Sequence, residues 1–198
     1  MESSIVREPR KSKREGILFQ FDKLTSIPND PHSTFTFMHL LIPHGPFVFD
    51  EHGNYVTLEE EKSNNIQINY IRQLRFLNKR LIEIIDKILT NSNPQPIIII
   101  QSDEGHYPKG YSYTERSLSQ YSADKLRHKF AIFNAFYFPD TNIEQIYPTI
   151  SPVNTFRLLF NLYFGENYEL LEDRHFNTNY YKYHRFLDVT KKLKTMDN

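Results

Sequence analysis

The sequence has 198 residues, a length typical of one compact domain and too short for a multidomain enzyme. The 24 Lys and Arg residues balance 24 Asp and Glu residues, so no overall basic charge favours nucleic acid as the main partner. The absence of cysteine excludes disulfides, thiolate nucleophiles and cysteine-based metal sites. Aromatic residues make up 15% of the chain and supply the large side chains that a core needs.

Both ends of the chain are polar. Residues 1–15 predict a solvated basic tail, with a basic juxtamembrane segment as the alternative. Residues 16–190 should form a single α/β domain, and residues 191–198 a polar C-terminal tail. No stretch approaches the roughly 20 apolar residues of a membrane-spanning helix, and the N-terminal residues lack the apolar region of a secretory signal.

In chain order, the first half predicts a helix, a strand, a long helix and a second strand. Ile17 to Ile27 has helical spacing, and the aromatic and apolar run Phe35–Ile42 predicts a buried strand. A capping box at Thr57 and Glu60 introduces a long amphipathic helix from Ile66 to Ile88, with a kink expected just before it. The β-branched run Ile97–Gln101 predicts the second strand, parallel to the first because a helix connects them.

The second half is less regular. Ser102–Arg127 is polar and predicts a long surface loop, and Phe130–Phe138 predicts a third strand. Ser151 as N-cap, Pro152 at the first helical position and Gly165 as the stop define a short helix. These elements predict an α/β fold with a mainly parallel sheet.

The most specific local feature is the sequence Ser102-Asp103-Glu104-Gly105, which follows the second predicted strand. Two carboxylates at the carboxyl edge of a parallel sheet would project into its crevice, where hard oxygen ligands suit magnesium, manganese or calcium. A nearby imidazole, from His44 or His106, would shift the preference toward manganese or zinc. The alternative interpretation is that Asp103 caps a loop and Glu104 is solvated.

His44 follows the first predicted strand in the sequence Pro43-His44-Gly45-Pro46. Parallel strands bring their carboxyl ends to one edge, so we expect His44 on the same rim as Asp103. There it could bind an anion or protonate a leaving group, or else hydrogen-bond a loop carbonyl. His39, inside the strand, is expected to be a core histidine.

Other polar residues have mainly structural interpretations. Asn154 and Arg157 lie among apolar neighbours on the Ser151 helix and should bond loop carbonyls. The long loop and the residues after it carry four basic side chains that could form an anion site, namely Arg116, Arg127, His128 and Lys129. We expect them instead to be solvated charges. Nucleophile-elbow, phosphate-loop, dinucleotide and zincin motifs are all absent from the sequence.

Several blocks together resemble one protein family. They read HLLIPHGPFVFD, QLRFLNKRLIEIIDKIL, IIIIQSDEG, KFAIFNAFYFP, YPTISPVNTFRLLFNLYFG and LLEDRHF. In this order they resemble the C-terminal part of the catalytic domain in the sulfatase-like branch of the alkaline phosphatase superfamily, over Ile17 to Val189. The resemblance implies part of a three-layer α/β/α domain with a mainly parallel sheet.

The resemblance also implies roles for individual residues. The family's H-x-P sequence supplies a histidine that contacts the phosphate or sulfate, which corresponds to His44. Its S-D-H-G turn supplies two metal ligands, which correspond to Asp103 and Glu104. Because Glu replaces His at the second ligand, the divalent metal could be manganese, zinc, magnesium or calcium. The family's nucleophile and first metal ligand precede the H-x-P segment, and no counterpart is identifiable in residues 1–34.

Our hypothesis is therefore that the chain is the C-terminal portion of a metal-dependent domain that hydrolyses or transfers phosphate or sulfate esters. No catalytic nucleophile is identifiable, so little turnover is expected from these residues alone, and a preceding segment or another chain would supply the nucleophile. The expected ligand is an anionic phosphate or sulfate ester. The resemblance implies an extracytoplasmic, membrane-associated parent protein, although the chain shows no signal or spanning segment.

The alternative is a non-catalytic α/β binding or interaction module that uses the tyrosine-rich loop within Ser102–Arg127 for recognition. We also expect self-association, because strands missing from the family's sheet would leave an open edge.

Overall fold

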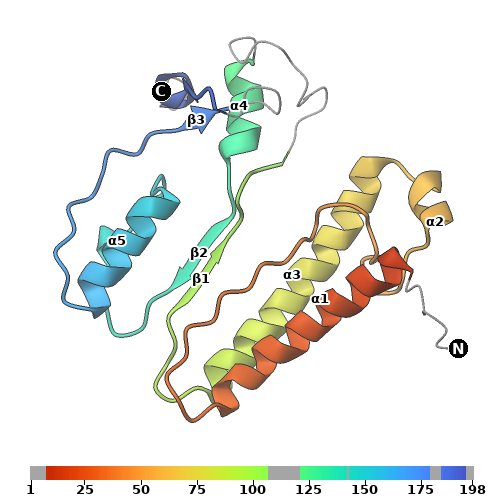
Figure 1. Cartoon of the computed structure of the whole chain (residues 1–198), viewed down its shortest axis with the longest axis horizontal. Helices are drawn as coiled ribbons and strands as arrows, with labels where there is room; N and C mark the ends of the chain where they lie inside the picture. Colours follow the sequence, from red (N-terminus) through yellow and green to blue (C-terminus); the bar gives the residue numbers. More distant parts are fainter. Residues whose placement is uncertain (1–7, 107–120, 142, 179–183, 195–198) are drawn as a thin grey trace, which may run out of the picture. The chain divides into compact units, whose positions relative to one another are not determined.

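The structure is a computed structural model that describes residues 8–106, 121–141, 143–178 and 184–194. It divides into two compact units, Met1–Pro96 and Ile97–Asn198, each of which is described by itself (Figure 1). Helices and strands are both present, as the α/β class requires. The sheets of the described residues are two-stranded and antiparallel, so the predicted mainly parallel sheet is not found there.

The first unit is helical. α1 (Pro9–Ser26) continues into a single 3-10 turn (Ile27–Asn29) and lies beside α3 (Ile66–Asn91), with the short α2 (Leu58–Ser63) between them in the chain (Figure 1). The predicted capping box at Thr57 and Glu60 is confirmed at the start of α2. The long helix is also confirmed, with a break between α2 and α3 where a kink was expected.

The N-terminal tail prediction is wrong from Pro9 onward, because these residues form the first half of α1. Arg10 and Arg14 are not solvated. Arg10 pairs with Glu61, and Arg14 donates to the Gly53 carbonyl oxygen at 3.2 Å. Charged side chains therefore fix this part of the helix, which has no apolar residue from which a buried helix could be predicted.

The predicted strand Phe35–Ile42 is not formed; the segment is irregular, with no strand beside it in the described residues. Ile42 is buried in the unit's core, whereas Phe35 and Phe37 are 86% and 81% exposed. The prediction for His39 is also wrong, because this residue is exposed and not in the core. Apolar composition predicted a strand, but a strand also requires a neighbour to pair its backbone.

The core of the first unit lies between α1, α3 and the loop that follows Ile42. This core positions the loop, because the apolar residues that follow His44 are packed into it. Its buried members are Ile17, Phe21, Ile42, Val48, Phe49, Leu77 and Ile84.

The second unit contains a short two-stranded antiparallel sheet. β1 (Ile98–Gln101) pairs antiparallel with β2 (Asn134–Tyr137), with Ile98 opposite Tyr137 and Gln101 opposite Asn134. The strand prediction for Ile97–Gln101 is confirmed. Before β2 the chain forms α4 (Ala123–Phe130), so the predicted third strand begins four residues late and the predicted loop is partly helical. The rest of that loop, residues 107–120, lies outside the described residues.

The remaining elements follow β2. They are a 3-10 turn (Ile143–Gln145), α5 (Pro152–Tyr163), β3 (Phe176–Asn177), β4 (Leu187–Asp188) and α6 (Thr190–Lys194). Ser151 caps α5 through its side chain, and Gly165 has a positive φ of 69° after the helix, as predicted. The predicted C-terminal tail is corrected, since it is helical as far as Lys194. Within the described ranges, none of the helices has both the length and the apolar character needed to cross a membrane.

Candidate functional site

The turn that follows β1 is held firmly in the second unit. Ser102 donates its backbone N–H to the Phe133 carbonyl oxygen at 2.9 Å, and its hydroxyl oxygen accepts the Phe133 N–H at 2.8 Å. Gly105 donates its N–H to the Lys129 carbonyl oxygen at 2.6 Å. The turn is thus fixed at both ends, against β2 and against the end of α4.

Gly105 is required at its position by close approach. A Cβ atom there would lie 2.1 Å from the His128 carbonyl oxygen and 2.8 Å from that of Ala131. Both are backbone atoms, which cannot move aside as a flexible side chain can. The glycine therefore permits the turn to dock on the C-terminal end of α4.

Asp103 and Glu104 lie between these anchors. The Asp103 side chain is exposed, and its Oδ1 atom accepts the Glu104 N–H at 3.0 Å. Its Oδ2 atom has no hydrogen-bond partner among the described residues. Glu104 is partly buried, and its carboxylate makes no hydrogen bond or close ion pair with the described part of the chain. Carboxylate oxygens of this kind are the ligands that hard divalent cations prefer.

Two adjacent carboxylates make only part of a metal site. No group of three or more His, Asp or Glu side chains suited to a metal ion is found in the described ranges. These two residues fit a metal as oxygen ligands, and further ligands would have to come from elsewhere.

Lys129 lies near the same turn. Its Nζ atom donates to Asn177 Oδ1 at 3.0 Å. Burial lowers the pKa of Lys129, while the Glu104 carboxylate acts in the opposite direction. Lys129 is therefore not the solvated charge that the sequence suggested. Arg127 and His128 are exposed, and Arg116 lies outside the described residues.

His44 lies in the first unit, in the loop after Ile42, and its side chain is exposed. Its Nδ1 atom is 2.6 Å from the Gly45 carbonyl oxygen. A carbonyl oxygen only accepts, so Nδ1 must carry the hydrogen. The Nε2 atom has no hydrogen-bond partner in the described part of the chain. The alternative from the sequence, a histidine bonded to a loop carbonyl, is therefore correct for one ring nitrogen and leaves the other available.

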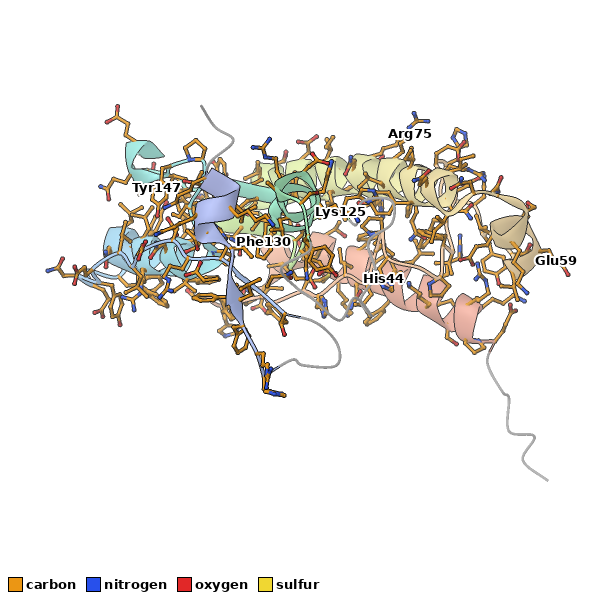
Figure 2. All side chains as sticks on the ribbon, turned by 90° about the horizontal axis from the view of Figure 1, so that it is seen from above. His44, Glu59, Arg75, Lys125, Phe130 and Tyr147 are labelled. Carbon is orange, nitrogen blue, oxygen red and sulfur yellow. The ribbon has the colours of Figure 1, made fainter. Side chains whose placement is uncertain are left out.

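The loop around His44 is held by two helices. Lys13 of α1 donates to the carbonyl oxygens of His44 at 2.9 Å and Pro46 at 3.2 Å. Gln73 of α3 donates to the His44 carbonyl oxygen at 3.4 Å. Figure 2, in which His44 is labelled, shows this residue beside the ribbon of α1. The expected common rim of His44 with Asp103 stays a prediction, because the two residues belong to different units.

Asn154 and Arg157 have the structural roles that the sequence predicted. Asn154 is fully buried and donates to the Leu171 carbonyl oxygen at 2.8 Å, and Arg157 donates to that of Glu169 at 3.0 Å. Asp173 accepts hydrogen bonds from Asn154 Nδ2 at 2.9 Å and from the Ser151 N–H at 3.0 Å. These bonds fasten the segment after α5 to the helix.

The roles of Lys13 and Gln73 were not predicted from the sequence. Gln73 had a recognisable signal, since it is a polar residue at helical spacing from Leu77, within the stripe that faces the core. Lys13 had none, because it lies in the segment that was interpreted as a tail.

Comparison with known proteins gave no match to a family model, to a curated protein or to a solved structure.

Proposed function

We propose that this chain is the C-terminal portion of a sulfatase-like domain that acts on phosphate or sulfate esters with a divalent metal. Asp103 and Glu104 would be metal ligands, and His44 would contact the anion. The family resemblance of the sequence blocks supplies the reaction class, and the geometry of the two local sites supports it.

The observation that carries the proposal is the anchored turn after β1. Ser102 and Gly105 fix the turn, and they leave an Asp103 carboxylate oxygen without a partner among the described residues. Fixed carboxylates bind a cation with a smaller loss of conformational freedom than mobile ones. A bound metal would supply Lewis-acid polarisation of a phosphoryl or sulfuryl oxygen.

The His44 loop supports the second half of the proposal. Its backbone is fixed, its Nδ1 atom is engaged by Gly45, and Nε2 is available for a ligand. An imidazolium Nε2–H can donate to an anionic oxygen.

In this proposal the nucleophile comes from a preceding segment or another chain. A covalent phospho- or sulfo-enzyme step requires such a group. The residues described here would then hold the metal and the transferred anion, and would not form the covalent bond.

Anion binding by the full chain tests the proposal without requiring turnover. Inorganic phosphate and sulfate are titrated by calorimetry into the chain with and without saturating manganese. We expect manganese-dependent binding that weakens about tenfold or more in His44→Ala, because one charged hydrogen bond to the anion is lost. We expect the dependence on manganese to be lost in Asp103→Ala, because a metal ligand is removed. Asp86→Ala, an exposed carboxylate on α3, is the matched control. Equal binding in all variants would contradict the proposal.

A second candidate is the non-catalytic interaction module. The observation that favours it is the exposed aromatic surface of α5 and of its C-cap residue Phe164, where Phe156, Phe160 and Phe164 are 41%, 41% and 63% exposed. Exposed apolar patches commonly mark interaction surfaces. Self-association of the chain, measured by light scattering, would support this candidate if Phe160→Ser and Phe164→Ser reduce it.

A further inference from the structure

We infer that Lys13 and Gln73 are positioning residues that hold the His44 turn so that the imidazole presents its Nε2 atom to the ligand. The inference rests on the proposed role of His44 and deepens it, since it identifies the contacting atom and the residues that orient it. Neither residue is expected to touch the ligand.

Lys13 acts on the turn from α1. Its Nζ atom donates to the carbonyl oxygens on both sides of Gly45, those of His44 and Pro46. Lys13 is partly buried, and this burial lowers the pKa of its ammonium group. Charged hydrogen bonds in such surroundings are stronger than those on an open surface.

Gln73 acts on the same turn from α3. It is fully buried, and its Oε1 atom accepts the N–H groups of Val48 at 2.8 Å and Phe49 at 3.2 Å. Its Nε2 atom donates to the His44 carbonyl oxygen. One side chain therefore connects the His44 peptide group to the buried segment that follows it. The backbone around His44 is set by two different helices.

The conformation of this backbone determines which ring nitrogen of His44 carries the hydrogen. The ring of His44 bonds the carbonyl oxygen of the next residue, Gly45, so its geometry depends on how the His44–Pro46 peptide groups are oriented. Neutral His44 is then the Nδ1–H tautomer, in which Nε2 carries the lone pair. Nε2 can accept a proton or coordinate a metal in this form, and it can donate to an anion once the ring is protonated.

The test is a spectroscopic measurement of the His44 tautomer. Long-range ¹H–¹⁵N correlation spectra of the full chain, at about pH 8.5 where imidazole is neutral, distinguish the two ring nitrogens. A His44→Gln sample assigns the signals. We expect the wild type to be mainly the Nδ1–H tautomer, and the ratio of Nδ1–H to Nε2–H to fall about fivefold in Lys13→Met, since one hydrogen bond of ordinary strength is lost.

Three further variants make the result specific. Lys13→Arg should restore most of the Nδ1–H form, because the guanidinium can donate to the same carbonyl oxygens. Lys13→Gln provides a second loss if Lys13→Met does not fold. Lys11→Met removes an exposed lysine of the same helix that pairs with Glu8, and should leave the tautomer unchanged. An unchanged ratio in both loss variants would overturn the inference.

The same samples separate this inference from the proposed function. If the tautomer responds to Lys13 but no variant binds phosphate or sulfate with manganese, the positioning holds and the proposed function fails. If anion binding requires His44 but the tautomer ratio is unchanged in the Lys13 variants, the proposed function stands and the positioning role is overturned.

Discussion

Arg10 pairs with Glu61, which lies 51 positions further along the chain, and the two side chains are only 11% and 20% exposed. Arg10 also donates to the carbonyl oxygens of Phe47 at 2.7 Å and Val56 at 3.0 Å. One guanidinium group thus ties the start of α1 to both ends of the loop that follows His44. The N-terminal segment that was predicted to be a tail therefore fixes the loop next to the candidate site residue His44.

Replacing Arg10 should destabilise the chain. Arg10→Met leaves Glu61 as a largely buried charge without its partner and leaves the Phe47 and Val56 carbonyl oxygens without their donor. We expect a loss of about 3 kcal/mol in the free energy of unfolding of the first unit, measured by urea denaturation. Lys11→Met is the control and should change stability by less than about 0.5 kcal/mol. Equal stability of Arg10→Met and Lys11→Met would contradict the account.

Two glycines should respond to alanine in opposite directions. At Gly105 the new Cβ atom would meet the His128 carbonyl oxygen, so Gly105→Ala should displace the turn and abolish metal binding, measured by calorimetry. At Gly16, in the middle of α1, nothing lies within 4 Å of the new atom. Gly16→Ala should raise helix stability by up to about 1 kcal/mol and leave metal binding intact. Normal metal binding by Gly105→Ala would show that the turn does not form the site.

Gln73→Leu should be strongly destabilising although it makes the core more apolar. The Val48 and Phe49 N–H groups would lose their acceptor while buried, at a cost of about 2 to 4 kcal/mol. The matched control is Gln67→Leu, an exposed position near the start of α3. Thermal unfolding followed by circular dichroism compares the two, and a stability of Gln73→Leu equal to or above that of wild type would be inconsistent with the observed bonds.

Asp173 should make the second unit sensitive to acid. Burial alone would raise its pKa, but hydrogen bonds from Ser151, Tyr147 and Asn154 lower the pKa below the ordinary value of 3.8. A lowered pKa in the folded state stabilises the fold above pH 3.8, and this stabilisation is lost as pH falls through the folded-state value.

Thermal unfolding between pH 7 and about pH 2 measures this effect. Asp173→Asn should lower stability by about 2 kcal/mol at neutral pH and show a weaker dependence on acid than the wild type. Asp86→Asn, at an exposed position of α3, should behave as the wild type does. A wild-type acid dependence in Asp173→Asn would contradict this assignment.

Local signals in the sequence predicted the local structure well. The capping residues Thr57 and Ser151 start their helices, and the β-branched run before Ser102 forms β1, because these features depend on neighbours in the chain. The turn that carries Asp103 could be predicted for the same reason. Its anchoring on α4 could not, since the close approach at Gly105 involves atoms more than twenty residues away.

Features that depend on distant partners were not predictable. Phe35–Ile42 has the composition of a strand, but no strand lies beside it in the described residues. Arg10 and Lys13 lie in a segment with the composition of a tail. They nevertheless hold the fold together, because carbonyl oxygens of a distant loop accept their hydrogen bonds. Sequence periodicity detects apolar faces, and it does not detect a helix that is fixed by charged side chains.

Metal binding by the full chain tests the central claim most directly. Metal-stripped protein is titrated by calorimetry with manganese, zinc, magnesium and calcium, in parallel with Asp103→Ala and the control Asp86→Ala. We predict saturable binding of at least one of these ions by the wild type and by Asp86→Ala, and its loss in Asp103→Ala. Absence of saturable binding, or equal binding by Asp103→Ala, would contradict the assignment of the turn after β1 as a metal site.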